Sequence, residues 1–253
     1  MLSKNLDSSP KKHREDHLHQ QNGWMSKWQD YIGEFVYGGI DGSVTTFAVV
    51  AGSAGAGLDS SVIIILGFAN LIADGFAMSV GSYLSNKAEK ENYDKHERIE
   101  YWEVDNLPEK EEEEIREIYE SKGFEGELLE QVVKVITADK DRWVDVMMKE
   151  ELNMTREEKS PFAMGAMTFV AFVLVGVIPL AAYVWNYSTG QYADQLFSIS
   201  IILTSLAFIG IGWLKSYVAQ TSRLRSILET LFLGAAAAIL SYFVGSFLEN
   251  MIA

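Results

Sequence analysis

Long apolar stretches alternate with polar segments along most of the chain, and their lengths are those of membrane-spanning helices. Five such stretches lie at about 34–57, 60–85, 161–187, 197–217 and 227–251. Each has roughly 20 to 27 residues, which at about 1.5 Å per residue reaches across about 30 Å of hydrocarbon. A soluble fold of 253 residues cannot cover this much apolar surface. The sequence therefore predicts an all-α membrane protein with five transmembrane helices.

Turn and bend signals mark the ends of these stretches. Residues 55–60 form a Gly-Ala-Gly-Leu-Asp-Ser turn, so the first two spans make a tight antiparallel hairpin. Pro161 stands in the first turn of the third span, where proline is well tolerated, and Pro179 lies inside that span and predicts a kink. The fourth and fifth spans are separated by a loop that holds Lys215, Arg223 and Arg225.

A polar insert of residues 87–159 separates the second span from the third. It has 24 acidic and 13 basic side chains, a net charge of −11 out of −14 for the whole chain. The helix of span two is expected to continue to about Glu103 and to break at residues 106–108. Further helices are predicted at about 109–121, 125–136 and 139–153, with Gly123 as a C-terminal stop and Thr137 or Asp139 as an N-cap. The insert is thus expected to be a small helical bundle.

These patterns divide the chain into four parts. Residues 1–30 are polar and contain His13, His17 and His19 but no apolar core of the kind found in a signal peptide, so we expect a disordered cytoplasmic tail. Transmembrane helices 1–2 occupy 31–86, a cytoplasmic acidic helical metal-binding domain occupies 87–159, and transmembrane helices 3–5 occupy 160–253. The three histidines have no fixed spacing on a structured element, which favours a tail without a metal site.

The distribution of Lys and Arg predicts the orientation in the membrane. These residues occur in the tail, in the insert and between spans four and five, whereas the other two loops have none. Because cytoplasmic loops carry the excess of positive charge, we expect the N-terminus and the insert to be cytoplasmic and the C-terminus to lie on the opposite side.

The absence of cysteine narrows the chemistry, because the chain can form neither disulfides nor thiolate metal sites. A metal ion would have to be held by oxygen, imidazole or thioether groups. No prosthetic group and no nucleic-acid partner are expected.

Two acidic side chains lie inside the predicted spans. Asp41 and Met78 are each about 10 Å from the cytoplasmic end at 1.5 Å per residue, and Asp74 is about 16 Å from it. A carboxylate at such a depth costs several kcal/mol unless it has a partner or an aqueous path, so a functional role is expected, above all for Asp41. For Asp74 a helix-packing role beside Gly75 is the alternative. Carboxylate oxygen and thioether sulfur together suit first-row divalent cations such as Fe²⁺.

Paired glutamates one helical turn apart recur in the insert. Glu100 with Glu103, and Glu111 with Glu114, can each present two carboxylates on one helix face. A third group consists of Met147, Met148 and Glu151. Solvated surface is the ordinary fate of such residues. The run from Glu111 to Glu114 favours a cation site, however, because uncompensated like charges destabilise a helix unless cations bind them.

Three longer segments are informative through their full sequences as well as through the spacing of single residues. They are Asp-Gly-Ser-Val-Thr-Thr-Phe-Ala-Val-Val-Ala-Gly from Asp41, Ala-Met-Ser-Val-Gly-Ser-Tyr-Leu-Ser from Ala77, and Trp-Val-Asp-Val-Met-Met-Lys-Glu-Glu-Leu from Trp143. Together with the order of spans and insert, they resemble the vacuolar iron transporter family from about Tyr31 to the C-terminus.

The resemblance implies a homodimer whose transport path lies between the subunits and is lined by the first two spans, through which Fe²⁺ leaves the cytoplasm in exchange for protons. Asp41 and Met78 match the family's metal residues in the membrane. The family's cytoplasmic metal-binding residues fall on these positions of the insert: Glu100, Glu103, Glu111, Glu114 and Glu151, with Met147 and Met148 beside the last.

Two other kinds of protein were weighed against a transporter. A membrane-anchored ferroxidase would use the glutamate cluster as a di-iron site, but such sites carry paired Glu-x-x-His motifs, and the insert's His96 is preceded three residues earlier by Tyr93. A metal sensor with a membrane anchor needs no acid in the first two spans, which Asp41 contradicts. The sequence thus predicts a transporter that is not an enzyme, in a bacterial inner membrane or a vacuole-type membrane, with Fe²⁺ or Mn²⁺ as cargo for detoxification or storage.

Overall fold

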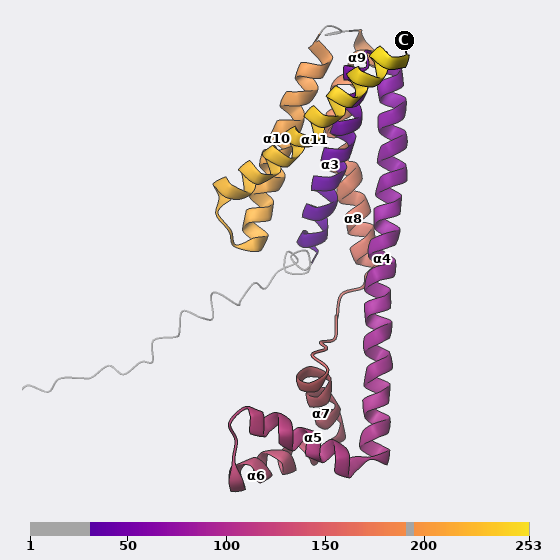
Figure 1. The fold of residues 1–253 in the computed structure, drawn as a ribbon. Coiled ribbons are helices and arrows are strands. Elements are labelled where there is room, and N and C mark those ends of the chain that lie inside the picture. Colours follow the sequence, from indigo (N-terminus) through magenta and orange to yellow (C-terminus); the bar gives the residue numbers. More distant parts are fainter. Residues whose placement is uncertain (1–30, 191–194, 253) are drawn as a thin grey trace, which may run out of the picture. The chain divides into compact units, whose positions relative to one another are not determined.

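The computed structural model describes residues 31–190 and 195–252, and these residues form helices and no strands (Figure 1). The predicted tail 1–30, with His13, His17 and His19, lies outside them. The all-α prediction is confirmed for the described part. It divides into two units, one made of residues up to 78 and from 167 onward, the other of residues 79–166.

Five of the described helical segments are long and apolar enough to cross a membrane. They are α3 (Ile32–Gly55), α4 (Ser60–Asn106), Pro161–Thr189, α10 (Leu196–Ala219) and α11 (Arg223–Ile252). The third is built from α8 (Pro161–Gly176) and α9 (Ala181–Thr189), which a 3₁₀ turn at Ile178–Leu180 joins, so the kink predicted at Pro179 is confirmed.

Helix α4 is much longer than a membrane is thick. Its 47 residues extend about 70 Å at 1.5 Å per residue, against about 30 Å of hydrocarbon. From Ser60 to Asn86 the only charged residue is Asp74, whereas basic and acidic residues follow each other closely from Lys87 onward. Only the first part of α4 therefore suits a bilayer, and the rest suits water.

Close backbone contacts hold the first unit together. Against α8, a Cβ atom at Gly42 of α3 would collide with the carbonyl oxygen of Phe172. On the side of α3 that faces α11, the backbones meet at Gly52 and Gly245, again with no room for a Cβ atom at Gly245. Small residues allow such approach in membrane proteins, where dispersion contacts replace the hydrophobic effect between helices. These contacts fix the helix that carries Asp41.

The second unit is a helical bundle with a core of its own. The end of α4 packs with α5 (Pro108–Ser121), α6 (Gly126–Thr137) and α7 (Lys140–Val146), and α7 runs into a π-helical turn at Met147–Glu151. The buried core consists of these residues: Tyr93, Val104, Ile115, Leu129, Val133, Ile136, Trp143, Val144, Met147 and Met148.

The predicted helix limits in the insert hold to within a few residues. Asp139 is the N-cap of α7 and its carboxylate accepts a hydrogen bond of 2.8 Å from the backbone N–H of Arg142. Gly123 follows the end of α5 with a φ of +93°, which favours glycine. The helical stretch predicted at about 139–153 runs from Lys140 to Glu151, and it changes to π-helical geometry at Met147.

The loop predicted between spans four and five is wrong in extent. Lys215 lies inside α10, whereas Arg223 and Arg225 lie in the first turn of α11, so only residues 220–222 connect the two helices. Both helices extend beyond their apolar stretches because polar side chains are compatible with helix outside the hydrocarbon.

Candidate metal site in the helical insert

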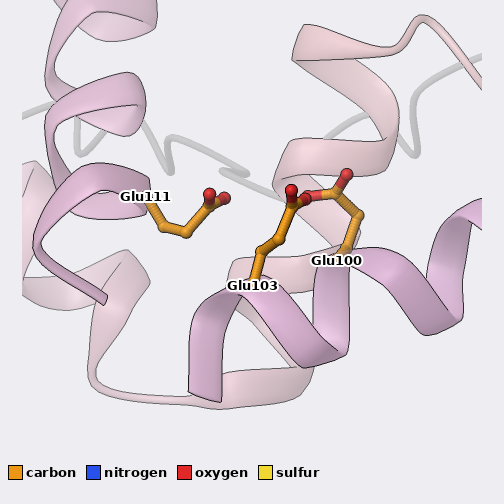
Figure 2. A group of neighbouring side chains, drawn as sticks. All are labelled: Glu100, Glu103 and Glu111. Carbon is orange, nitrogen blue, oxygen red and sulfur yellow. The ribbon is translucent and has the colours of Figure 1, made fainter. Parts of the chain in front are cut away.

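Three glutamates of the insert converge on one point (Figure 2). Glu100 and Glu103 stand one turn apart near the end of α4, and Glu111 lies in the first turn of α5. Each offers a carboxylate oxygen, and these atoms lie within 4.8 Å of one another. The break between the helices creates this arrangement: Leu107 leaves helical geometry and Pro108 starts α5, which brings Glu111 back toward α4.

Two of these carboxylates are buried without hydrogen-bond partners. Glu100 is 3% exposed and Glu111 is 1% exposed. Both carboxylate oxygens of Glu111 and Oε2 of Glu100 are buried and have no hydrogen bond within the described residues. An ionised carboxylate in this situation is costly, so it either takes up a proton or binds a cation.

The electrostatics of the group favour the proton when no metal is bound. Burial, and then repulsion from Glu151 and Glu103, raises the pKa of Glu100 to about 7. Burial, and then repulsion from Glu114 and Glu103, raises the pKa of Glu111 to about 7. Near neutral pH a divalent cation would therefore displace protons that these carboxylates hold.

Glu151 and Glu114 lie at the edge of the same group. Burial raises the pKa of Glu151, and repulsion from Glu114 and Glu103 adds to the shift. The five glutamates that the sequence singled out thus form one electrostatically connected cluster, with three of them close enough to share a metal ion.

Met147 and Met148 belong to the hydrophobic core of the bundle. Both are completely buried in the core of the bundle, and both lie in the π-helical turn that ends at Glu151. Such turns are rare and occur frequently at functional sites. The sequence gives no signal for this turn, which contains Glu151 as its last residue.

The acidic run of α5 is not uncompensated, contrary to the expectation from sequence. Lys110 Nζ lies 2.6 Å from Glu114 Oε1 and 4.0 Å from Glu111 Oε1. Arg116 pairs with Glu112, Glu113 and Glu130. Among the four glutamates from 111 to 114, Glu111 is the one that is buried and has no hydrogen bond within the described residues. The spacing of four residues between Lys110 and Glu114 is the sequence signal for this ion pair.

The acids predicted in the spans lie in the first unit. Asp41 is on α3 and Asp74 on α4, both partly exposed, and they are near enough for their charges to interact. Met78 is one turn beyond Asp74 on α4 and is partly exposed as well. The antiparallel hairpin thus brings together the two acids, which are 33 positions apart in the sequence.

Comparison with known proteins gives a consistent result. Residues 32–246 match the VIT family. The vacuolar iron transporter of Toxoplasma gondii is 33% identical over 246 residues, which are 95% of this chain and 79% of the relative. Vacuolar iron transporter 1 of Tulipa gesneriana is 30% identical, over 88% of this chain and 89% of the relative. The vacuolar iron transporter of Plasmodium falciparum is also 30% identical, over 92% and 87%.

These relatives bear on the ferroxidase hypothesis, because their names describe transport. The converging group in the described residues contains glutamates alone, with no histidine of the Glu-x-x-His kind. The ferroxidase hypothesis therefore gains no support. With the match extending over most of its length and five helices suited to a bilayer, this chain is an integral membrane protein that belongs to the VIT family.

Proposed function

We propose that the chain exports Fe²⁺, and other first-row divalent cations such as Mn²⁺, from the cytoplasm in exchange for protons. The observation that carries this proposal is the converging group of Glu100, Glu103 and Glu111, in which Oε2 of Glu100 and both oxygens of Glu111 are buried and have no hydrogen bond within the described residues. Carboxylate oxygens accept Fe²⁺ and Mn²⁺ about equally well. The names of the relatives favour iron.

The insert collects the cation and the spans move it. Glu100, Glu103 and Glu111 hold the ion, with Glu114 and Glu151 adding negative charge and Met147 and Met148 supporting the turn behind them. In the membrane the path runs past Asp41, Asp74 and Met78. Asp41 is the coupling group, since a carboxylate that leaves water favours its protonated form until a cation arrives.

A second copy of the chain completes this path. Ala69, Ala73 and Ala77 form an exposed row of small side chains at every fourth position of α4, where another helix can approach closely. Asp74 and Met78 lie directly beside this row. A homodimer that packs along it encloses both side chains between the subunits. Because the chain has no cysteine, an Ala73→Cys variant in a bilayer should form an intersubunit disulfide, whereas Phe232→Cys, at an exposed position of α11, should not.

The orientation follows from charge. Lys and Arg concentrate in the insert and around residues 215–225, and neither occurs at 56–59 or 186–195. The insert and the N-terminus therefore face the cytoplasm, and the C-terminus lies on the opposite side. In a vacuole-type membrane export from the cytoplasm serves storage, and in a bacterial inner membrane it serves detoxification.

Purified protein in liposomes tests the proposal, with an Fe²⁺ indicator inside, a pH dye to follow protons and an anaerobic buffer. We expect Fe²⁺ to enter while protons move out, at a rate that rises when the interior is made acidic. In a parallel assay in air-saturated buffer, where O₂ can accept the electrons, oxidation of Fe²⁺ without uptake would support the ferroxidase instead. An Fe²⁺ uptake rate that does not depend on the pH gradient would mean that the protein transports Fe²⁺ without exchanging it for protons.

A further inference from the structure

A pocket between the end of α10 and the start of α11 has no part in the proposed transport path. Its volume is about 420 Å³, within the range of about 300 to 1,000 Å³ that is usual for small-ligand sites. The side chains that line it are mainly polar or charged: Lys215, Thr221, Ser222, Arg225, Ser226 and Glu229. It is large enough for a phosphate group with part of the molecule that carries it.

Glu229 forms hydrogen bonds with two cations at this pocket and leaves other N–H donors of both available. Lys215 Nζ donates to Glu229 Oε2 at 3.1 Å, and Arg225 Nε donates to Glu229 Oε1 at 2.9 Å. An ammonium group has three N–H donors and a guanidinium group has five. Each cation uses one of these donors for the carboxylate of Glu229. Arg223 adds a third positive charge within the same segment. The pocket is therefore positive overall and has donors to spare.

Hydroxyl groups complete the lining. Thr221 Oγ1 and Ser226 Oγ lie 2.9 Å apart, and Ser222 immediately precedes the first residue of α11. Cations held in place next to hydroxyl donors make up the chemistry that binds phosphate oxygens.

Exposed apolar side chains in the same segments of α10 and α11 as the lining residues indicate where the phosphate comes from. Leu224 and Leu228 are 68% and 55% exposed, and the aromatic rings of Trp213 and Tyr217 are about half exposed. Trp and Tyr gather at the level of the lipid head groups, and exposed leucines next to them face acyl chains. A free phosphate ion would make no use of these exposed apolar side chains, whereas a phospholipid would.

We propose that the pocket binds the head-group phosphate of an anionic phospholipid in the leaflet nearest the α10–α11 connection. Basic pockets between transmembrane helices commonly take acidic lipid head groups. The lipid would hold the ends of α10 and α11 together, and through α11 it would support α3, which packs against it and carries Asp41. The site shares no residue with the insert or with the proposed transport path.

Native mass spectrometry of the full-length protein tests the proposal, with phosphatidylglycerol or phosphatidylcholine added at equal concentration. We expect phosphatidylglycerol to be retained and phosphatidylcholine to be lost, with no displacement by millimolar inorganic phosphate. Ser222→Asp adds a negative charge at the pocket, yet aspartate caps a helix as well as serine does. This variant should lose the retained lipid, and its neutral partner Ser222→Asn should keep it.

A second pair of variants guards against a change in folding. Replacing both Lys215 and Arg225 with glutamine should abolish retention, whereas the same change at Lys90 and Lys95, exposed on the water-facing part of α4, should not. Equal retention of both lipids, retention in Ser222→Asp or equal loss in the Lys90 and Lys95 control would each overturn the proposal. Displacement by phosphate alone would assign the pocket to a soluble anion instead.

Discussion

The acids of the insert and the acids of the spans are held in opposite ways. In the insert, Glu100, Glu103 and Glu111 come from one chain, converge within 4.8 Å and are largely closed to water. In the spans, Asp41 and Asp74 stand on two helices and are both partly exposed, and no third acid or histidine among the described residues joins them at that distance. One site is complete within a single chain, and the other presents its acids on a surface.

This difference suggests a division of labour. A closed group of carboxylates binds a cation well but releases it slowly, which suits collecting ions from dilute solution. A pair of acids on an open surface binds weakly until a second copy covers it, which suits passing ions on. Changes in the insert should then alter the metal concentration needed for transport, whereas changes in the spans should alter the maximal rate.

The largest effect is expected from Asp41→Asn. This change removes the carboxylate that we propose exchanges metal for protons, so the maximal rate of Fe²⁺ transport should fall by about a hundredfold or more, on the order of 3 kcal/mol. Proteoliposome flux at saturating Fe²⁺, with a pH dye, measures it. Asp59→Asn makes the same change in the exposed turn between α3 and α4 and should transport normally. Coupled flux that survives in Asp41→Asn would remove Asp41 from the mechanism.

A smaller effect is expected from Glu111→Gln in the insert. Loss of one of three converging carboxylates should weaken Mn²⁺ binding to the full-length protein by about tenfold or more, roughly 1.4 kcal/mol. Transport should need more metal to reach half its maximal rate, with that maximal rate unchanged. Calorimetric titration and flux at several metal concentrations measure the two quantities.

Glu117→Gln is the matched control for this change, because Glu117 is exposed on the same helix. It should leave both quantities unchanged. An equal loss of binding in both variants would mean that the net charge of α5 attracts the metal, without a defined site. A fall in the maximal rate of Glu111→Gln alone would place the insert on the transport path itself.

The pH dependence of the insert should differ from that of an ordinary acidic surface. Because the pKa values of Glu100 and Glu111 are raised to about 7 by burial, the folded insert binds more protons than the unfolded chain from about pH 4.5 to 7. The stability of the metal-free insert should therefore fall as pH rises through this window, while its Mn²⁺ affinity increases up to about pH 8. Hydrogen exchange of peptides from 100–151, corrected for intrinsic rates, follows the stability. Glu111→Gln should flatten both trends.

Much of this architecture could be predicted from the sequence because each signal was local. Apolar length predicted the spans, Pro179 predicted the bend, and Asp139 and Gly123 predicted helix ends in the insert. Each of these depends on a few neighbouring residues and on backbone chemistry alone. The pairing of Glu100 with Glu103 depends only on helical spacing, and it was visible for the same reason.

What could not be predicted depends on contacts between elements. Spacing alone treats Glu111 and Glu114 as equals, yet α5 turns Glu111 into the bundle and leaves Glu114 with Lys110 at its edge. The π-helical turn at Met147 has no local signature. The position of Lys215 was misjudged because a lysine near the end of an apolar stretch fits a loop and a helix equally well, and only the packing of α10 on α11 decides.

The smallest effect is expected from Lys110→Gln, and it distinguishes two roles for this cation. Lys110 is about 62% exposed, so its pairs with Glu114 and Glu111 contribute little to stability. If its ammonium group competes with the metal for these carboxylates, removing it should strengthen Mn²⁺ binding by about twofold to fivefold, less than 1 kcal/mol. Lys134→Gln, at an exposed position of α6, should change nothing. Weaker binding in Lys110→Gln would mean that the lysine holds Glu114 in place for the metal, and the insert would then use a basic side chain to shape its acidic site.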